Sequence, residues 1–153
     1  MNLLTVEILR QADSHWGIVE AAPNSGPKID DWLHRVGLLP GQPWCAAFAW
    51  SIIDDACKQL GLVNSIPAVW FQSTHKIHNH LPESTRIDTP CPGCLCLIDE
   101  GHGHGHTTLC ESTNMGIEGD VVTIAGNQNN GVRRHAYHAT DFAWFHDVSV
   151  MFP

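Results

Sequence analysis

The 153-residue sequence has few basic residues, with eight Lys and Arg against sixteen Asp and Glu and a formal net charge of −8. A nucleic-acid-binding protein needs a basic surface to neutralise phosphates, so this composition argues against nucleic acid as a partner. Internal repeats and linker-like stretches are also missing from the sequence. We therefore expect a single domain, residues 1–153, which is long enough to bury a core of its own.

A long apolar run is missing as well. The stretch Met1–Arg10 has apolar positions, but Glu7 and Arg10 interrupt them, and it has neither a basic start nor a small-residue cleavage site. This pattern is typical of an amphipathic helix and not of a signal peptide or a membrane span. We therefore expect synthesis in the cytoplasm without a signal peptide, and no insertion into a membrane.

The spacing of apolar residues predicts helices in the first half of the chain and strands in the second. Helices are expected at 2–13, 27–36, 45–60 and 68–81, with a short helical turn at 16–21. Strands are expected at 94–99, 106–111, 121–125, 131–138 and 144–151. Helices followed by strands indicate an α+β domain, with N-terminal helices packed on one side of a mostly antiparallel C-terminal β-sheet.

The segment 41–50, GQPWCAAFAW, places Cys45 at the start of an amphipathic helix, because the prolines before it keep the preceding residues out of the helix. Unpaired backbone N–H groups and the positive end of the helix dipole favour the thiolate at such a position. A cysteine on the apolar face of a helix is nevertheless more often an inert core residue. A nucleophilic role for Cys45 therefore depends on suitable partners elsewhere.

A cysteine nucleophile needs a base and a polar group that orients the base. His106 stands at the start of one predicted strand, and Asn127 follows the end of another. On the His106 strand, alternation puts Thr108 and Cys110 on the same face as the histidine. We expect that face to turn toward the Cys45 helix.

Four motifs follow one another along the chain: Pro43–Phe48 (PWCAAF), Pro92-Gly93 before a strand, Gly105-His106, and Gly126–Gln128 (GNQ). In order and spacing they resemble the CHAP family of papain-like cysteine amidases and peptidases, and the resemblance covers nearly the whole chain. Two positions differ from the family pattern. Ala125 replaces a Glu that many members have, and Cys94 replaces the Asp that usually follows Pro-Gly.

The resemblance implies a papain-like fold in which Cys45 is the nucleophile, His106 is the general base and acid, and Asn127 orients the imidazole. Papain-like enzymes hold the developing oxyanion with backbone and side-chain donors. Here these donors would be the Cys45 backbone N–H and the Gln42 side chain.

Members of the CHAP family cleave amide bonds in peptidoglycan, so the resemblance implies peptidoglycan as the partner, without a cofactor. The protein is expected to be a monomeric, phage endolysin-like N-acetylmuramoyl-L-alanine amidase or stem- or cross-link endopeptidase, and a secreted antibacterial amidase effector is the alternative. Either enzyme would reach the wall through a holin or a secretion system. Trp44, with Trp70 and Trp144, is a candidate to line the substrate cleft, and a place in the core is the alternative for each. Arg133, with Arg134, is a candidate to meet a substrate carboxylate, and a solvated strand edge is the alternative.

The sequence also contains half of a zinc-binding pattern, Cys91-Pro92-Gly93-Cys94. Cys96, Cys110 or the nearby histidines could complete it, but a closed site is usually built from two such pairs, and a second pair is missing. Cys94 and Cys96 also alternate like small apolar residues of a strand. We therefore predict no metal, and keep as alternatives a zinc-binding Cys/His structural or interaction module and a binding module that has lost catalysis.

Overall fold

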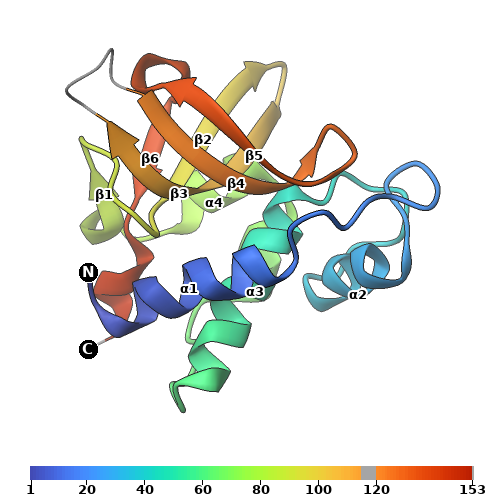
Figure 1. Ribbon diagram of the computed structural model, residues 1–153, viewed down its shortest axis with the longest axis horizontal. Coiled ribbons are helices and arrows are strands. Elements are labelled where there is room, and N and C mark those ends of the chain that lie inside the picture. Colours follow the sequence, from blue (N-terminus) through green and yellow to red (C-terminus); the bar gives the residue numbers. More distant parts are fainter. Residues whose placement is uncertain (115–119, 153) are drawn as a thin grey trace.

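The computed structural model describes residues 1–114 and 120–152 and has helices in the first half and strands in the second (Figure 1). Over the described residues, the α-helices are α1 (Leu3–Ser14), α2 (Pro27–Arg35), α3 (Cys45–Gln59) and α4 (Thr74–His80). The strands are β1 (Arg86–Ile87), β2 (Leu95–Gly101), β3 (His104–Asn114), β4 (Asp120–Gln128), β5 (Gly131–His138) and β6 (Trp144–His146). Short 3₁₀ helices lie at Ala68–Gln72, Glu83–Thr85, Ala139–Asp141 and Val148–Met151. The predicted α+β class is confirmed.

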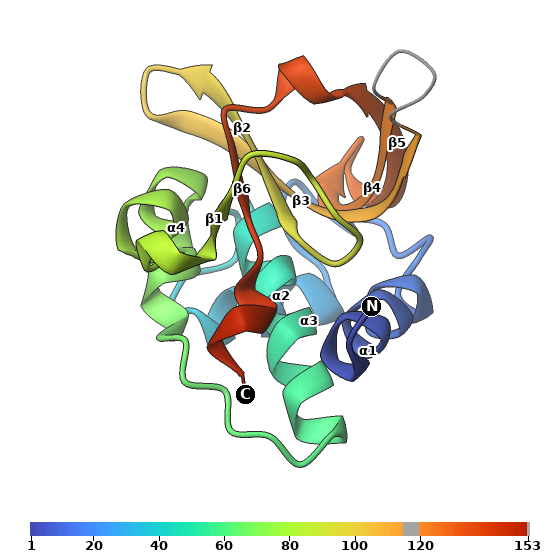
Figure 2. The same cartoon turned by 90° about the vertical axis from the view of Figure 1, so that its left-hand side faces the viewer.

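The six strands form one sheet in the order β1-β6-β2-β3-β4-β5, and every pair of neighbours is antiparallel. The last strand, β6, lies between β1 and β2, so after the β4–β5 hairpin at one edge the chain returns to the opposite side of the sheet. Figure 1 shows the sheet curving above α1 and α3, and Figure 2 shows α4 beside the β1 and β6 end of the sheet.

The main hydrophobic core lies between the helices and one face of the sheet. Phe48 and Ile52 of α3 pack there with Leu97, Leu109 and Ile124, which come from three neighbouring strands, and all five side chains are buried. Full burial of each such side chain contributes about 1.5–3 kcal/mol to folding. The predicted packing of helices on one side of the sheet is confirmed.

A second, smaller core lies on the opposite face of the sheet and contains Cys110 with Val121 and Phe142. Since Leu109 points toward the helices and side chains alternate along a strand, Cys110 points away from them. The prediction that this face turns toward the Cys45 helix is therefore wrong at Cys110, although His106 near the start of the same strand interacts with Cys45.

Residues 16–21 are predicted as a helical turn but form a bridge to the sheet instead. Gly17 has a φ of 87°, its N–H donates to the Val132 carbonyl at 3.0 Å, and Val19 pairs with Gly131. This segment follows β5 because its backbone hydrogen bonds are made with that strand rather than within a helix.

The other differences from the predicted elements also have local causes. The predicted helix 68–81 is divided at Ser73, whose side chain accepts the Lys76 N–H and starts α4 as a new helix. The predicted strand 144–151 ends early because the Asp147 carboxylate accepts the Ser149 N–H and begins a 3₁₀ helix. None of the described helices has the length and apolar composition required to cross a bilayer.

Candidate active site

Cys45 is the first residue of α3, and it is buried with 5% of its surface exposed. The first hydrogen bond within the helix runs from the Phe48 N–H to the Trp44 carbonyl at 2.9 Å, so the N–H groups before Phe48 are not used inside the helix. One of them, the Ala46 N–H, contributes to the lowered pKa of the Cys45 thiol. The helix start therefore offers backbone donors at the position of the thiol.

Trp44 fixes the start of α3 against the rest of the protein. Its ring is completely buried and stacks on Trp32 at 5.6 Å, and its indole N–H donates to a Glu20 carboxylate oxygen at 3.0 Å. A Cβ placed on Gly126 of β4 would lie 2.6 Å from the Trp44 ring and 2.7 Å from the Phe48 Cβ, so only glycine fits. The prediction that Trp44 contacts substrate is wrong, because its ring has no surface to offer.

His106 of β3 and the Thr107 N–H both act on the Cys45 thiol and favour its thiolate form. Burial disfavours the thiolate, but the charge and hydrogen bond of His106 and the two backbone donors outweigh it, so the pKa of Cys45 lies below its usual value. Burial also disfavours the charged imidazole, yet its contacts with Cys45 and Gln128 raise the pKa of His106. Both shifts favour a thiolate–imidazolium pair.

Gln128 is the residue that orients the imidazole in the structure. Its Oε1 atom accepts from the His106 Nε2–H at 2.9 Å and from the Tyr137 hydroxyl at 3.0 Å. Burial raises the pKa of Tyr137, so the phenol keeps its proton and donates it. Because Nε2 is hydrogen-bonded to Gln128, we infer that Nδ1 is the ring nitrogen of His106 that interacts with Cys45.

This arrangement corrects the prediction that Asn127 holds the imidazole. Ala125 pairs with Arg133 and Gln128 pairs with Gly131, so two residues of β4 stand opposite one residue of β5, which is a β-bulge. Within the bulge, Asn127 has a φ of 56°. The extra residue shifts the alternation of side chains by one position, and Gln128 takes the place that regular alternation gives to Asn127.

A cleft of about 220 Å³ opens beside Cys45. Gln42, Ser73, Thr74 and His104 are among the residues that line it, so it combines polar groups from the loop before α3, from α4 and from the β2–β3 hairpin. Gln42 is exposed at this cleft, where sequence analysis places a donor to the oxyanion. The lining combines polar side chains with few charges.

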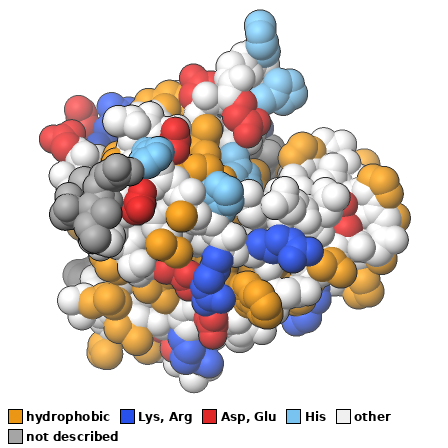
Figure 3. All heavy atoms as spheres, turned by 45° about the horizontal axis from the view of Figure 1, so that its top comes forward, with side chains coloured by type: hydrophobic (Ala, Val, Ile, Leu, Met, Phe, Trp, Pro, Cys, Tyr) orange, Lys and Arg blue, Asp and Glu red, His pale blue; other side chains and the backbone are white. Residues whose placement is uncertain are grey.

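Arg133, which is expected to meet a substrate carboxylate, lies outside this lining. Its guanidinium donates to the Asn129 carbonyl at 3.3 Å, at the turn between β4 and β5. On the face drawn in Figure 3, histidine, acidic and basic side chains are interspersed and no extended basic area is present.

Sequence reasoning missed Gln128 and Tyr137 as partners of His106. The Asn129-Asn130 pair after Gln128 is the sequence signal that a hairpin turn begins there, which makes Gln128 the last paired residue of its strand. Both asparagines have positive φ and form a two-residue turn closed by Gln128 and Gly131. No family model, curated protein or solved structure matches this chain, so its membership of the CHAP family remains a prediction.

Proposed function

We propose that this protein is a cysteine hydrolase of papain-like design that cleaves amide bonds in peptidoglycan. The observation that carries the proposal is the interaction of Cys45 with His106 at a helix start that borders an open cleft. A buried structural cysteine needs neither an imidazole partner nor a lowered pKa. Both features are typical of a thiol that reacts.

In the proposed reaction, the Cys45 thiolate attacks the carbonyl carbon of an amide and forms a tetrahedral intermediate. The Cys45 backbone N–H, with Gln42 as the second donor, stabilises its oxyanion. The intermediate collapses to a thioester as the C–N bond breaks and His106 gives its proton to the leaving amine. His106 then takes a proton from water, which hydrolyses the thioester, releases the acid and restores the ion pair.

The resemblance of the Pro43–Phe48 segment to CHAP proteins supports peptidoglycan as the substrate. The cleft supports the same choice in one respect, because its hydroxyl, amide and imidazole groups suit a neutral, hydrogen-bonding substrate such as a sugar-linked peptide. The scissile bond is then the muramoyl-alanine amide or a bond of the stem or cross-link peptide. Release through a holin or a secretion system would bring the enzyme to the wall.

The substrate class can be tested by incubating the purified protein with defined muropeptides and analysing the products by mass spectrometry. We expect two products whose masses add up to the substrate plus one water, and the identity of the new amine gives the bond. A peptide of unrelated sequence serves as the control. Intact muropeptides would contradict the proposed substrate, and hydrolysis of the control peptide alone would move the assignment to a general peptidase.

A further inference from the structure

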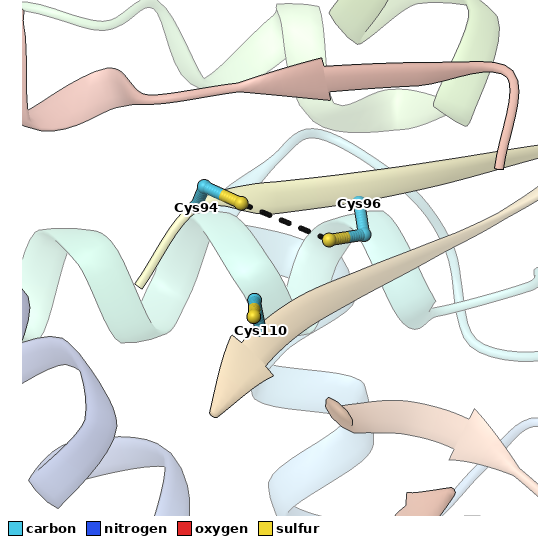
Figure 4. A group of neighbouring side chains, drawn as sticks. All are labelled: Cys94, Cys96 and Cys110. Carbon is cyan, nitrogen blue, oxygen red and sulfur yellow. Dashed lines mark hydrogen bonds between the residues drawn. The ribbon is translucent and has the colours of Figure 1, made fainter. Parts of the chain in front are cut away.

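Three cysteines that the proposed mechanism does not use meet on the sheet face opposite α3. The sulfur atoms of Cys94, Cys96 and Cys110 all lie within 4.8 Å of one another, and those of Cys94 and Cys96 are 3.7 Å apart. Figure 4 shows the sulfur atoms of Cys94 and Cys96 facing each other, with Cys110 close by on the neighbouring strand. All three residues are completely buried, and none forms a disulfide.

The strand pairing explains this cluster. Cys94 directly precedes β2 and Cys96 is its second residue, so the two side chains lie on the same face of the sheet. Cys110 lies opposite Cys94, because the Cys110 N–H donates to the Cys94 carbonyl at 2.9 Å and the next residues pair in register. A pair on one strand and a third thiol on its neighbour thus form a group that no single sequence motif reveals.

A fourth thiol is held close by a tight turn. The Cys94 N–H donates to the Cys91 carbonyl at 3.0 Å, which closes a four-residue β-turn with Pro92 and Gly93 at its centre. A turn with proline in the second position and glycine in the third has a positive φ at the glycine, and Gly93 has a φ of 85°. The Cys91 N–H in turn donates to the Cys94 sulfur at 3.4 Å. Cys91 is half-buried and lies outside the 4.8 Å group, so its side chain must turn inward to join the other three.

The spacing of the sulfur atoms fits a metal with four thiolate ligands. A tetrahedral zinc ion with Zn–S bonds of about 2.3 Å places its sulfur ligands about 3.8 Å apart, close to the separation of Cys94 and Cys96. Val121 and Phe142 pack around the cluster, which shields it from water as expected for a structural site. The Cys91 N–H offers the kind of hydrogen bond that stabilises a thiolate bound to zinc.

We propose that Cys91, Cys94, Cys96 and Cys110 form a structural zinc site that ties the start of β2 to β3. Each thiol releases its proton to solvent on binding the ion. The site excludes Cys45 and His106, so the proposed hydrolase does not depend on it. The sequence lacks a second Cys-x-x-Cys pair, which argues against a metal, but strand pairing brings Cys96 and Cys110 together with Cys94 as the remaining ligands.

The test is the metal content of protein purified under reducing conditions without a histidine tag. We expect about one zinc per chain. The Cys96→Ser and Cys110→Ser variants should lose it, and Cys57→Ser should keep it, because Cys57 is equally buried but lies in the other core. Full zinc occupancy in both ligand variants would overturn the proposal.

A measurement on the unaltered protein covers the case in which the ligand variants fail to fold. After zinc is removed with a chelator, titration with Co²⁺ should produce thiolate-to-cobalt charge-transfer absorption, and the thermal midpoint of unfolding should be lower without metal than with it. Protein that contains no zinc and develops no such absorption would overturn the proposal. A disulfide within the cluster in protein prepared under reducing conditions would also contradict it.

Discussion

Replacing Cys45 with alanine is expected to abolish peptidoglycan hydrolysis, with a loss of at least about 10⁴-fold in rate. In the proposed mechanism the Cys45 sulfur forms the thioester, and neither His106 nor the backbone donors can replace it. The change removes one buried sulfur at the cleft, so the helix and its anchor Trp44 should stay in place. The release of new amino groups from purified sacculi measures the loss.

The matched control for this variant is Cys57→Ala. Cys57 lies on the same helix and is also completely buried, but its pKa is raised to about 11 by burial and by the charge of Asp54, which marks it as an inert thiol. The control should retain the activity of the unaltered protein. Undiminished hydrolysis by Cys45→Ala, with a native circular dichroism spectrum, would show that another group performs the chemistry.

Replacing Gln128 with alanine is expected to lower kcat by about 10²-fold, because the His106 imidazole loses the acceptor that fixes its orientation. The alkaline limb of the pH–rate profile should move to lower pH as well, because the active form needs a protonated His106 and contact with Gln128 contributes to the raised pKa of that imidazole. A variant with a purely structural defect would lose activity equally at every pH.

The comparison that separates Gln128 from its neighbour is Asn127→Gly. Glycine adopts the φ of 56° found at Asn127 without strain, so this change removes the side chain and leaves the bulge intact. We expect nearly full activity from it. If Asn127→Gly lost as much activity as Gln128→Ala, or if Gln128→Ala were fully active, the assignment of the orienting residue to Gln128 would be wrong.

The first half of the chain could be predicted well because its signals are local. The apolar spacing from Cys45 onward and the prolines before it determine α3 and its start, and this start carries the candidate nucleophile. His106 is a candidate base because it stands at the start of a predicted strand, and the family resemblance then selects it among eleven histidines. The interaction of His106 with Cys45 in the structure agrees with that choice.

The features that could not be predicted depend on how strands pair. Gln128 faces His106 because one extra residue in β4 shifts the alternation of side chains. The pairing register between β4 and β5, which creates this shift, cannot be read from the sequence pattern of either strand. Cys110 faces away from α3 and joins Cys94 for the same kind of reason, since its place is set by its partner strand. Trp44 was misjudged because its tight packing against Gly126 becomes visible only when α3 and β4 meet.

The central claim, that Cys45 and His106 form a thiolate–imidazolium pair, is tested most directly by the rate at which iodoacetamide alkylates Cys45 at different pH values. Because the folded pKa of Cys45 is lowered, thiolate should persist below the usual thiol pKa of about 8.5 and disappear only as the pH falls through the lowered value. Peptide mapping separates this cysteine from Cys57, which serves as the slow internal reference. The His106→Ala variant should lose the reactivity at neutral pH, because burial then dominates and raises the pKa. Alkylation of Cys45 that begins only at or above the usual thiol pKa, and does not change in His106→Ala, would contradict the account.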